Sequence, residues 1–327
     1  MTAEAIARLQ GSDPLPPGLS GGVVAIGNFD GVHRGHQAVL GTAADIARRD
    51  GLPLICLTFE PHPRTVFRPD QPVPRLTPAP MRARLLEALG FDAVVEQAFD
   101  KSFATIEPEA FVSEILVDRL RARHVVAGFD FHYGRRRAGT PETLSAAGDK
   151  HGFETTLVPA LGGEDGEIVS SSRIRTMLEA GDVAAAAEYL GYRWTIGGSV
   201  QEGQKLGRTL GYPTANLLLM PDTILRFGIY AVRLRRGDGS LHDGVASFGR
   251  RPTFDNGAAL FETFLFDFSE GLYGEPVTVS LFGFLRGEEK FDSAEALIAQ
   301  MDRDSAETRD ILAGVSPISA LDRRVAF

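Results

Sequence analysis

The pattern of apolar residues changes near residue 190, and this change limits the folds that are open to the chain. Before it, short apolar runs alternate with segments of helical spacing. The runs predict buried strands at 22–29, 52–59, 91–99, 123–131 and 155–160. The segments between them predict helices at 33–51, 81–90, 108–122 and 140–152. Such alternation is typical of a doubly wound parallel sheet, so we expect a Rossmann-like α/β domain.

From Trp194 onward the chain reads as short β-branched and aromatic strands separated by glycine-rich turns. Asp238-Gly239 predicts a hairpin turn, and Ser293 predicts the cap of a last helix over 293–314. We therefore expect a small antiparallel β-barrel with a C-terminal helix. The predicted strands lie at 228–236, 241–249, 260–268 and 275–285, and the predicted domains at 1–187 and 188–327.

Charge and composition exclude several classes of partner. The formal net charge is -9, which argues against general binding to nucleic acid or to a membrane surface. No apolar stretch approaches the ~20 residues of a membrane helix, and the first ten residues do not resemble a secretory signal. The one cysteine, Cys56, lies in an apolar run and fits a reducing compartment. We expect a cytoplasmic location, and no obligate protein partner is indicated.

The segment GNFDGVHRGH (27–36) follows the first predicted strand and opens a helix. Its glycines allow close backbone approach, and His33 and His36 share one face of the helix start, where free N–H groups favour anions. Such imidazoles can donate hydrogen bonds to phosphate oxygens. A metal site would need a third ligand, for which His62 is the one tempting candidate, and a simple turn is the third possibility.

Two further segments are expected at strand ends, where ligands bind in parallel sheets. GFDFHYGRRRAG (128–139) follows a predicted strand and carries three consecutive arginines that could hold phosphate. VSSSRIR (169–175) opens a helix with three serines that can cap it. Arg173 and Arg175 lie about 200° apart around a helix, so at most one of them can face the sheet.

The barrel half contains EGQKLGRTLGYPTAN (202–216) but no GxxxxGK[ST], so a kinase here would not be a P-loop enzyme. Gly203 and Gly207 make a flexible loop, and Lys205 and Arg208 are available for phosphate. Thr214 and Asn216 offer the oxygen ligands that Mg²⁺ accepts, although the pattern alone favours a polar hairpin loop that enters the next strand.

Glu262 lies inside the aromatic strand LFETFLFDF (260–268), on the face of Leu260 and Phe264. A carboxylate in such a strand either faces solvent or serves as a general base, and the pattern leaves both open.

These motifs together resemble the bacterial bifunctional riboflavin kinase/FMN adenylyltransferases, or FAD synthetases. GNFDGVHRGH resembles their GxFDGxHxGH signature, VSSSRIR their ISSTxxR element and GFDFHYG their GxDFxFG stretch. GRTLGYPTAN, RPTF and FETFLFDFSEGLYG resemble the riboflavin kinase blocks. The matches span residues 25–291, with substitutions at Val169, Ser172 and Tyr133, and with Phe264 where many relatives have histidine.

The resemblance implies a function for each half. The barrel would phosphorylate riboflavin to FMN with ATP and Mg²⁺, and the sheet domain would adenylylate FMN to FAD and release pyrophosphate. The implied catalytic residues are Glu262, His33 and His36, and the implied metal ligands are Thr214 and Asn216. The implied flavin-binding residues are His62, Gly128, Asp130 and Arg286. The implied ATP- and phosphate-binding residues are Gly27, Asn28, Phe29, Asp30, Gly35, Ser171, Ser172, Arg175, Gly203, Lys205, Gly207, Arg208 and Thr214.

Two other functions fit parts of the chain. One is another adenylyl-transferring enzyme with the HxGH motif whose barrel only binds the acceptor, but PTAN together with Glu262 opposes it. The other is a flavin- or nucleotide-sensing protein with degraded sites. Loss of His36, Arg175, Asn216 or Glu262 would have favoured a sensor, and all four are present.

Overall fold

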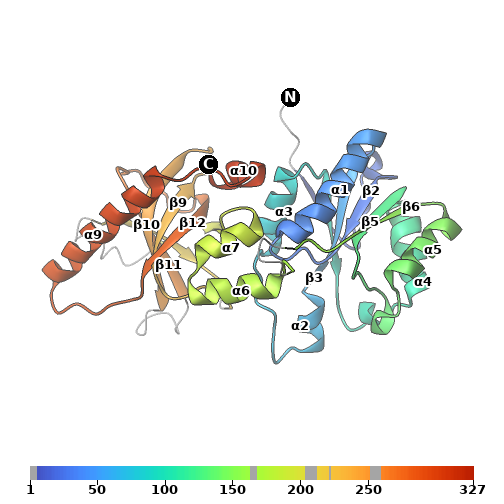
Figure 1. The fold of residues 1–327 in the computed structure, drawn as a ribbon, viewed down its shortest axis with the longest axis horizontal. Helices are drawn as coiled ribbons and strands as arrows, with labels where there is room; N and C mark the ends of the chain where they lie inside the picture. The colour runs from blue at the N-terminus through green and yellow to red at the C-terminus, as the bar shows by residue number, and fades with distance from the viewer. Residues whose placement is uncertain (1–5, 163–167, 203–211, 221, 251–258) are drawn as a thin grey trace. The chain divides into compact units, whose positions relative to one another are not determined.

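The computed structural model describes residues 6–162, 168–202, 212–220, 222–250 and 259–327. The chain forms two compact units, Met1–Ser170 and Ser171–Phe327 (Figure 1). The helices of the described residues include none that is both long and apolar enough to cross a membrane.

The first unit is built on a six-stranded parallel sheet, with the order β1-β4-β3-β2-β5-β6. The chain runs from β2 through β3 to β4, then returns to the other side of β2 to form β5 and β6. The direction of winding therefore reverses between β2 and β5, which is where such sheets bind ligands. The strands are β1 (Ala7–Gln10), β2 (Val23–Ile26), β3 (Leu54–Glu60), β4 (Ala93–Ala98), β5 (His124–Gly128) and β6 (Glu154–Val158).

Helices cover both faces of this sheet (Figure 1). α1 packs on β2, β3 and β5, while Phe111, Leu116 and Leu144 pack against the opposite face. The doubly wound parallel sheet is thus confirmed. The helices are α1 (Arg34–Asp50), α2 (Pro63–Phe67), α3 (Ala79–Ala88), α4 (Pro108–Ala110), a π-helical segment (Phe111–Arg119) and α5 (Pro141–His151).

Two elements of the first unit differ from the sequence expectation. β1 was not expected, because only four residues pair with β4 and their burial merely alternates. The helix expected over 108–122 begins as α4 and continues as a π-helix from Phe111, a change of winding that apolar spacing does not reveal.

The second unit contains a six-stranded sheet with the order β7-β12-β9-β10-β11-β8, in which all pairs are antiparallel. A bridge between Gln201 and Asn216 joins the two edges, so the barrel is nearly closed. Tyr230, Phe248 and Phe261 are buried in its core. The strands are β7 (Thr195–Ser199), β8 (Thr214–Leu218), β9 (Gly228–Arg235), β10 (Leu241–Arg250), β11 (Ala259–Leu265) and β12 (Pro276–Arg286).

Helices precede and follow the barrel in this unit. α6 (Ser171–Ala180) packs on α7 (Val183–Leu190), and α7 contacts β12. The backbone N–H of Arg226 donates to Leu178 at 3.0 Å, which ties the end of α6 to the strand region. The expected terminal helix is α9 (Ala294–Ala313), with Ser293 as its cap. A second helix, α10 (Ala320–Ala326), follows it and was not expected.

Candidate functional site

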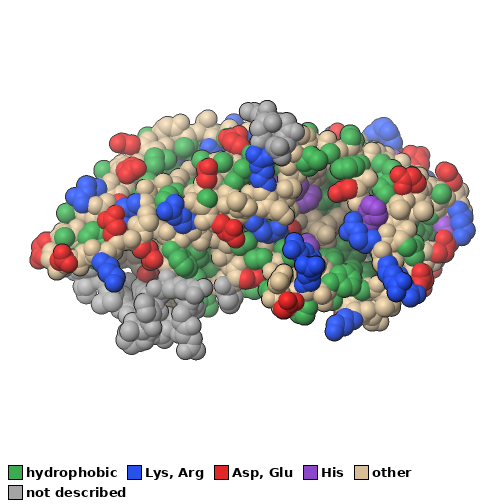
Figure 2. Space-filling view, turned by 60° about the horizontal axis from the view of Figure 1, so that its bottom comes forward, with side chains coloured by type: hydrophobic (Ala, Val, Ile, Leu, Met, Phe, Trp, Pro, Cys, Tyr) green, Lys and Arg blue, Asp and Glu red, His purple; other side chains and the backbone are tan. Residues whose placement is uncertain are grey.

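The loop that leaves β2 has a strained backbone that places the two histidines. Phe29 and Val32 have φ values of 46° and 40°, and Gly31 has φ 89°. Only glycine adopts such values without cost, so the fold must hold the two other residues in place. The loop ends at His33, which caps α1. Figure 2 shows histidine side chains near lysine or arginine side chains on one face of this unit.

His33 and His36 form a stacked pair, with ring centroids 3.6 Å apart and an interplanar angle of 16°. The backbone N–H of His36 donates to Nδ1 of His33 at 3.3 Å, so the proton of a neutral His33 resides on Nε2. A Cβ on Gly35 would lie 3.3 Å from the His33 ring, which leaves little room for a larger residue. The pair therefore presents a defined tautomer of His33.

Burial, and secondly the charge of His33, hold the pKa of His36 well below its usual value of 6.5. His36 is thus neutral at pH 7, and its ring meets Phe29 edge-on at 5.4 Å. Its buried Nδ1 has no hydrogen-bond partner among the described residues. A neutral imidazole can donate a hydrogen bond to a phosphate oxygen.

Other predicted residues of the first unit lie at neighbouring strand ends. Gly128 ends β5, and a Cβ on it would lie 3.3 Å from Oδ1 of Asp130. The structure therefore brings Gly128 and Asp130 together, beyond the strand that borders β2. His62 follows β3, on the other side of β2, and caps α2 by accepting from the N–H of Arg64 at 3.1 Å.

Asp30, Asn28, Phe29 and Gly27 shape the loop. Asp30 is 2% exposed, and its Oδ1 accepts from backbone N–H groups at 76 and 77. The backbone carbonyl of Asn28 accepts from the Thr58 hydroxyl, which joins the loop to β3. A Cβ on Gly27 would meet the Phe29 ring at 2.9 Å. These contacts fix the loop conformation.

Ser171, Ser172 and Arg175 lie on α6, the first helix of the second unit. The guanidinium of Arg173 stacks over the Tyr189 ring at 4.8 Å. Tyr189 belongs to α7, so Arg173 contacts that helix. Arg175 is the arginine that matches the sequence motif.

In the second unit, the strand register brings the PTAN segment and Glu262 together. Asn216 of β8 is the direct partner of Glu262 on β11, and Thr214 is the partner of Phe264. Direct partners on antiparallel strands share a face, so Thr214, Asn216 and Glu262 lie on the same side of the sheet. Ser247 of β10 is the partner of Glu262 on its other flank, and the sequence alone did not single it out.

The burial of β11 follows the expected alternation, since Phe261, Thr263 and Leu265 are buried and Glu262 and Phe264 are half-buried. Phe264 packs against Tyr212 with centroids 4.6 Å apart, which fits a packing role.

Arg286 ends β12 and makes contacts inside the barrel unit. Its Nε and Nη2 donate to the Asp304 carboxylate at 3.0 and 2.7 Å, and Nη1 donates to the carbonyl of Gly287. Arg286 therefore fastens β12 to α9. The predicted residues Gly203, Lys205, Gly207 and Arg208 lie outside the described residues.

Among the described residues, no group of three or more His, Cys, Asp or Glu side chains could hold a metal ion. Mg²⁺ does not require such a group, because hydroxyl and amide oxygens, phosphates and water can complete its shell. Thr214 and Asn216 supply oxygens of this kind beside the Glu262 carboxylate. The residues present therefore fit Mg²⁺.

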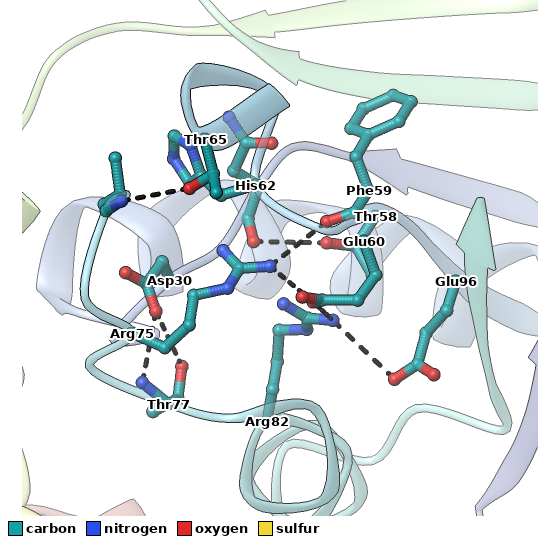
Figure 3. A network of polar contacts seen from close by, with 12 residues as sticks. Asp30, Thr58, Phe59, Glu60, His62, Thr65, Arg75, Thr77, Arg82 and Glu96 are labelled. Atoms are coloured by element: carbon teal, nitrogen blue, oxygen red, sulfur yellow. Dashed lines mark hydrogen bonds and ion pairs between the residues drawn. The ribbon is translucent and has the colours of Figure 1, made fainter. Parts of the chain in front are cut away.

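A buried network of arginines and glutamates also lies at the end of β3, and sequence reasoning missed it (Figure 3). Arg75 and Arg82 both pair with Glu60, and Arg82 is fully buried and also approaches Glu96. The signal for it was a single arginine at a core position of the predicted helix, Arg82 beside Met81 and Leu85.

Comparison with known proteins identifies the two halves. Residues 16–173 match the FAD synthetase family model, and residues 190–312 match the riboflavin kinase family model. Two relatives named bifunctional riboflavin kinase/FMN adenylyltransferase come from Listeria monocytogenes and Escherichia coli K12. They are 40% and 37% identical to this chain, covering 89% and 91% of it and 92% and 95% of the relatives.

A solved structure, described as a macrolide-efflux protein from Streptococcus pneumoniae, is 32% identical with a TM-score of 0.80. The similarity covers 95% of this chain and all of that one. The two family models occur in the order in which the two sites occur in the structure. The chain therefore belongs to the bifunctional riboflavin kinase/FMN adenylyltransferase family, transferases that make FMN from riboflavin and FAD from FMN.

Proposed function

We propose that residues 188–327 phosphorylate riboflavin with Glu262 as the general base. Glu262 takes the proton of the terminal ribityl hydroxyl as that oxygen attacks the γ-phosphorus of ATP, and ADP leaves. The observation that carries this proposal is the direct pairing of Glu262 with Asn216 across β11 and β8. This register supports a base that acts beside oxygen ligands on one face of the sheet.

Thr214 and Asn216 would hold Mg²⁺ in this reaction, and Mg²⁺ neutralises charge on the ATP phosphates when bound. Lys205, Arg208 and the glycines Gly203 and Gly207 would contact phosphate, as the family resemblance implies.

We assign FMN adenylylation to residues 1–187. The phosphate of FMN attacks the α-phosphorus of ATP and pyrophosphate leaves, so no covalent enzyme intermediate is required. His33 would donate its Nε2–H to a phosphate oxygen, a role supported by the fixed Nδ1 contact with the N–H of His36. The family resemblance adds Ser171, Ser172 and Arg175 as phosphate ligands.

The flavin-binding residues of this half would be His62, Gly128 and Asp130. They lie at or just after the ends of β3 and β5, the two neighbours of β2, so they flank the histidine loop. We also propose a cytoplasmic location, which the unpaired thiol of Cys56 supports.

Separate variants test the two sites. Glu262→Gln keeps the shape but removes the base, so riboflavin kinase kcat should fall by about 10²–10⁴ while FAD formation from supplied FMN persists. His33→Ala should lower the rate of FAD formation from FMN and leave riboflavin kinase activity intact. Glu270→Gln, in an exposed ion pair with Arg236, is the matched carboxylate control and should leave both rates intact. If Glu262→Gln abolished both reactions, or neither, the assignment would fail.

A further inference from the structure

The segment Arg75–Thr77, here called the clasp, hydrogen-bonds to the histidine loop through a set of buried contacts (Figure 3). Oδ1 of Asp30 accepts from the N–H groups of Leu76 and Thr77 at 3.0 and 3.1 Å. In return, the Thr77 hydroxyl accepts from the N–H of Gly31 at 2.8 Å. The clasp therefore makes contacts in both directions with two consecutive loop residues.

These contacts lie at the part of the histidine loop whose backbone is strained. Gly31 lies between Phe29 and Val32, the two residues that are not glycine yet have positive φ. Strained conformations persist only when surrounding contacts determine them. The hydrogen bond from the N–H of Gly31 to the Thr77 hydroxyl is such a contact. His33, the cap of α1, follows Gly31 by two residues.

The other end of the clasp holds the end of β3. Nη2 of Arg75 donates to the Phe59 carbonyl at 3.2 Å and to the Glu60 carboxylate. The same carboxylate oxygen accepts from buried Arg82 at 3.0 Å. Glu60 lies two residues before His62, so the clasp connects the nucleotide loop with the proposed flavin side (Figure 3).

Thr77 is 1% exposed, so its side chain is withdrawn from any bound substrate. We propose that Thr77 and Arg75 are positioning residues for FMN adenylylation, which hold the histidine loop and the end of β3 at a fixed separation. The proposal rests on the assignment of adenylylation to this unit. A misplacement of reacting groups by about 1 Å costs on the order of a hundredfold in rate, so a modest loosening is measurable.

The test compares Thr77→Val with Thr77→Ser in the full chain. Valine keeps the shape and loses the acceptor for Gly31, whereas serine keeps the hydroxyl. Thr77→Val should lower kcat for FAD formation from FMN about tenfold or more and change KM for ATP less than about threefold. Thr77→Ser should restore most of kcat. Riboflavin kinase activity of the same chain is the internal reference and should be unchanged.

Thr65→Val is the matched control. The Thr65 hydroxyl also accepts from a backbone N–H of the same connection, but the donor is Val73, at 3.0 Å, and not a residue of the histidine loop. Its kcat should stay within about twofold of wild type, since no loop contact is lost.

If Thr77→Val does not fold, Arg75→Lys is the second test variant. Lysine keeps the positive charge but cannot hold the Phe59 carbonyl and the Glu60 carboxylate together as the planar guanidinium does. It too should lower kcat of adenylylation more than it raises KM.

Three results would overturn the positioning role. These are equal kcat for Thr77→Val and Thr77→Ser, a rise in KM for ATP with kcat unchanged, or parallel loss of both activities. A wild-type chain that makes no FAD from FMN would instead refute the proposed function itself.

Discussion

Asp322 on α10 forms the most completely buried ion pair of the barrel unit among the described residues, and its removal should weaken this unit selectively. Its carboxylate is fully buried and pairs with Arg193, two residues before β7. It also accepts from the N–H groups of Arg193 and Ile318 at 2.8 and 3.0 Å. Asp322→Asn keeps the volume but removes the charge from three contacts.

The loss in free energy of unfolding caused by Asp322→Asn follows from two independent estimates. Each hydrogen bond to a charged group contributes about 1.5–3 kcal/mol. Loss of one partner from a buried ion pair costs about 3–5 kcal/mol. Because asparagine retains a carbonyl acceptor, we expect the free energy of unfolding to fall by about 3 kcal/mol, the lower end of the range for a buried ion pair. For a unit of this size that corresponds to a fall in Tm of about 6–12 °C.

The assay heats the full chain in steps and measures the remaining riboflavin kinase activity after each step. This activity should be lost at a lower temperature in Asp322→Asn than in the wild type. Asp310→Asn, on the exposed side of α9, is the control and should not shift the curve. A shift below about 2 °C would refute the energetic reasoning, because it is smaller than 1 kcal/mol predicts.

Three further predictions concern pH, the thiol and the limits of the barrel unit. Because burial and then the charge of His33 lower the pKa of His36 below 6.5, the unfolded chain takes up this proton more readily than the folded chain. Stability in urea should therefore fall between pH 7 and pH 5, and fall less in His36→Gln. Burial raises the pKa of Cys56 to about 12, so iodoacetamide at pH 8 should label it only after unfolding. A fragment 171–327 should melt at a higher temperature by circular dichroism than 188–327, which lacks α6 and the first five residues of α7; equal melting temperatures would contradict this.

Local patterns predicted the elements that are long and strongly periodic. α9 begins at its predicted cap, Ser293, and the face of Glu262 follows from alternation along β11 alone. β1 could not be predicted, because four residues with one partner strand leave almost no pattern. α10 is similarly short, and the buried contacts of Asp322 come from residues far away in the sequence.

The candidate sites also combine features that the sequence predicts with features that only the structure shows. Residue types and spacing marked His33, His36, Asn216 and Glu262, but only the strand order shows which of them meet. The clasp was missed because its bonds involve backbone N–H groups, which carry no sequence signal. The role of Arg286 stays a prediction, although its bonds to Asp304 and Gly287 show that its guanidinium already has partners.

The pairing of Asn216 with Glu262 also determines which changes of length the kinase half can accept. Side chains alternate along a strand, so one residue inserted or deleted within β11 before Glu262 would turn its carboxylate into the barrel core. The same change in the turn between β9 and β10, around Gly239, leaves this register untouched. A change in the length of that turn therefore leaves the proposed kinase site intact, whereas the number of residues along β8 and β11 determines whether Asn216 and Glu262 share a face.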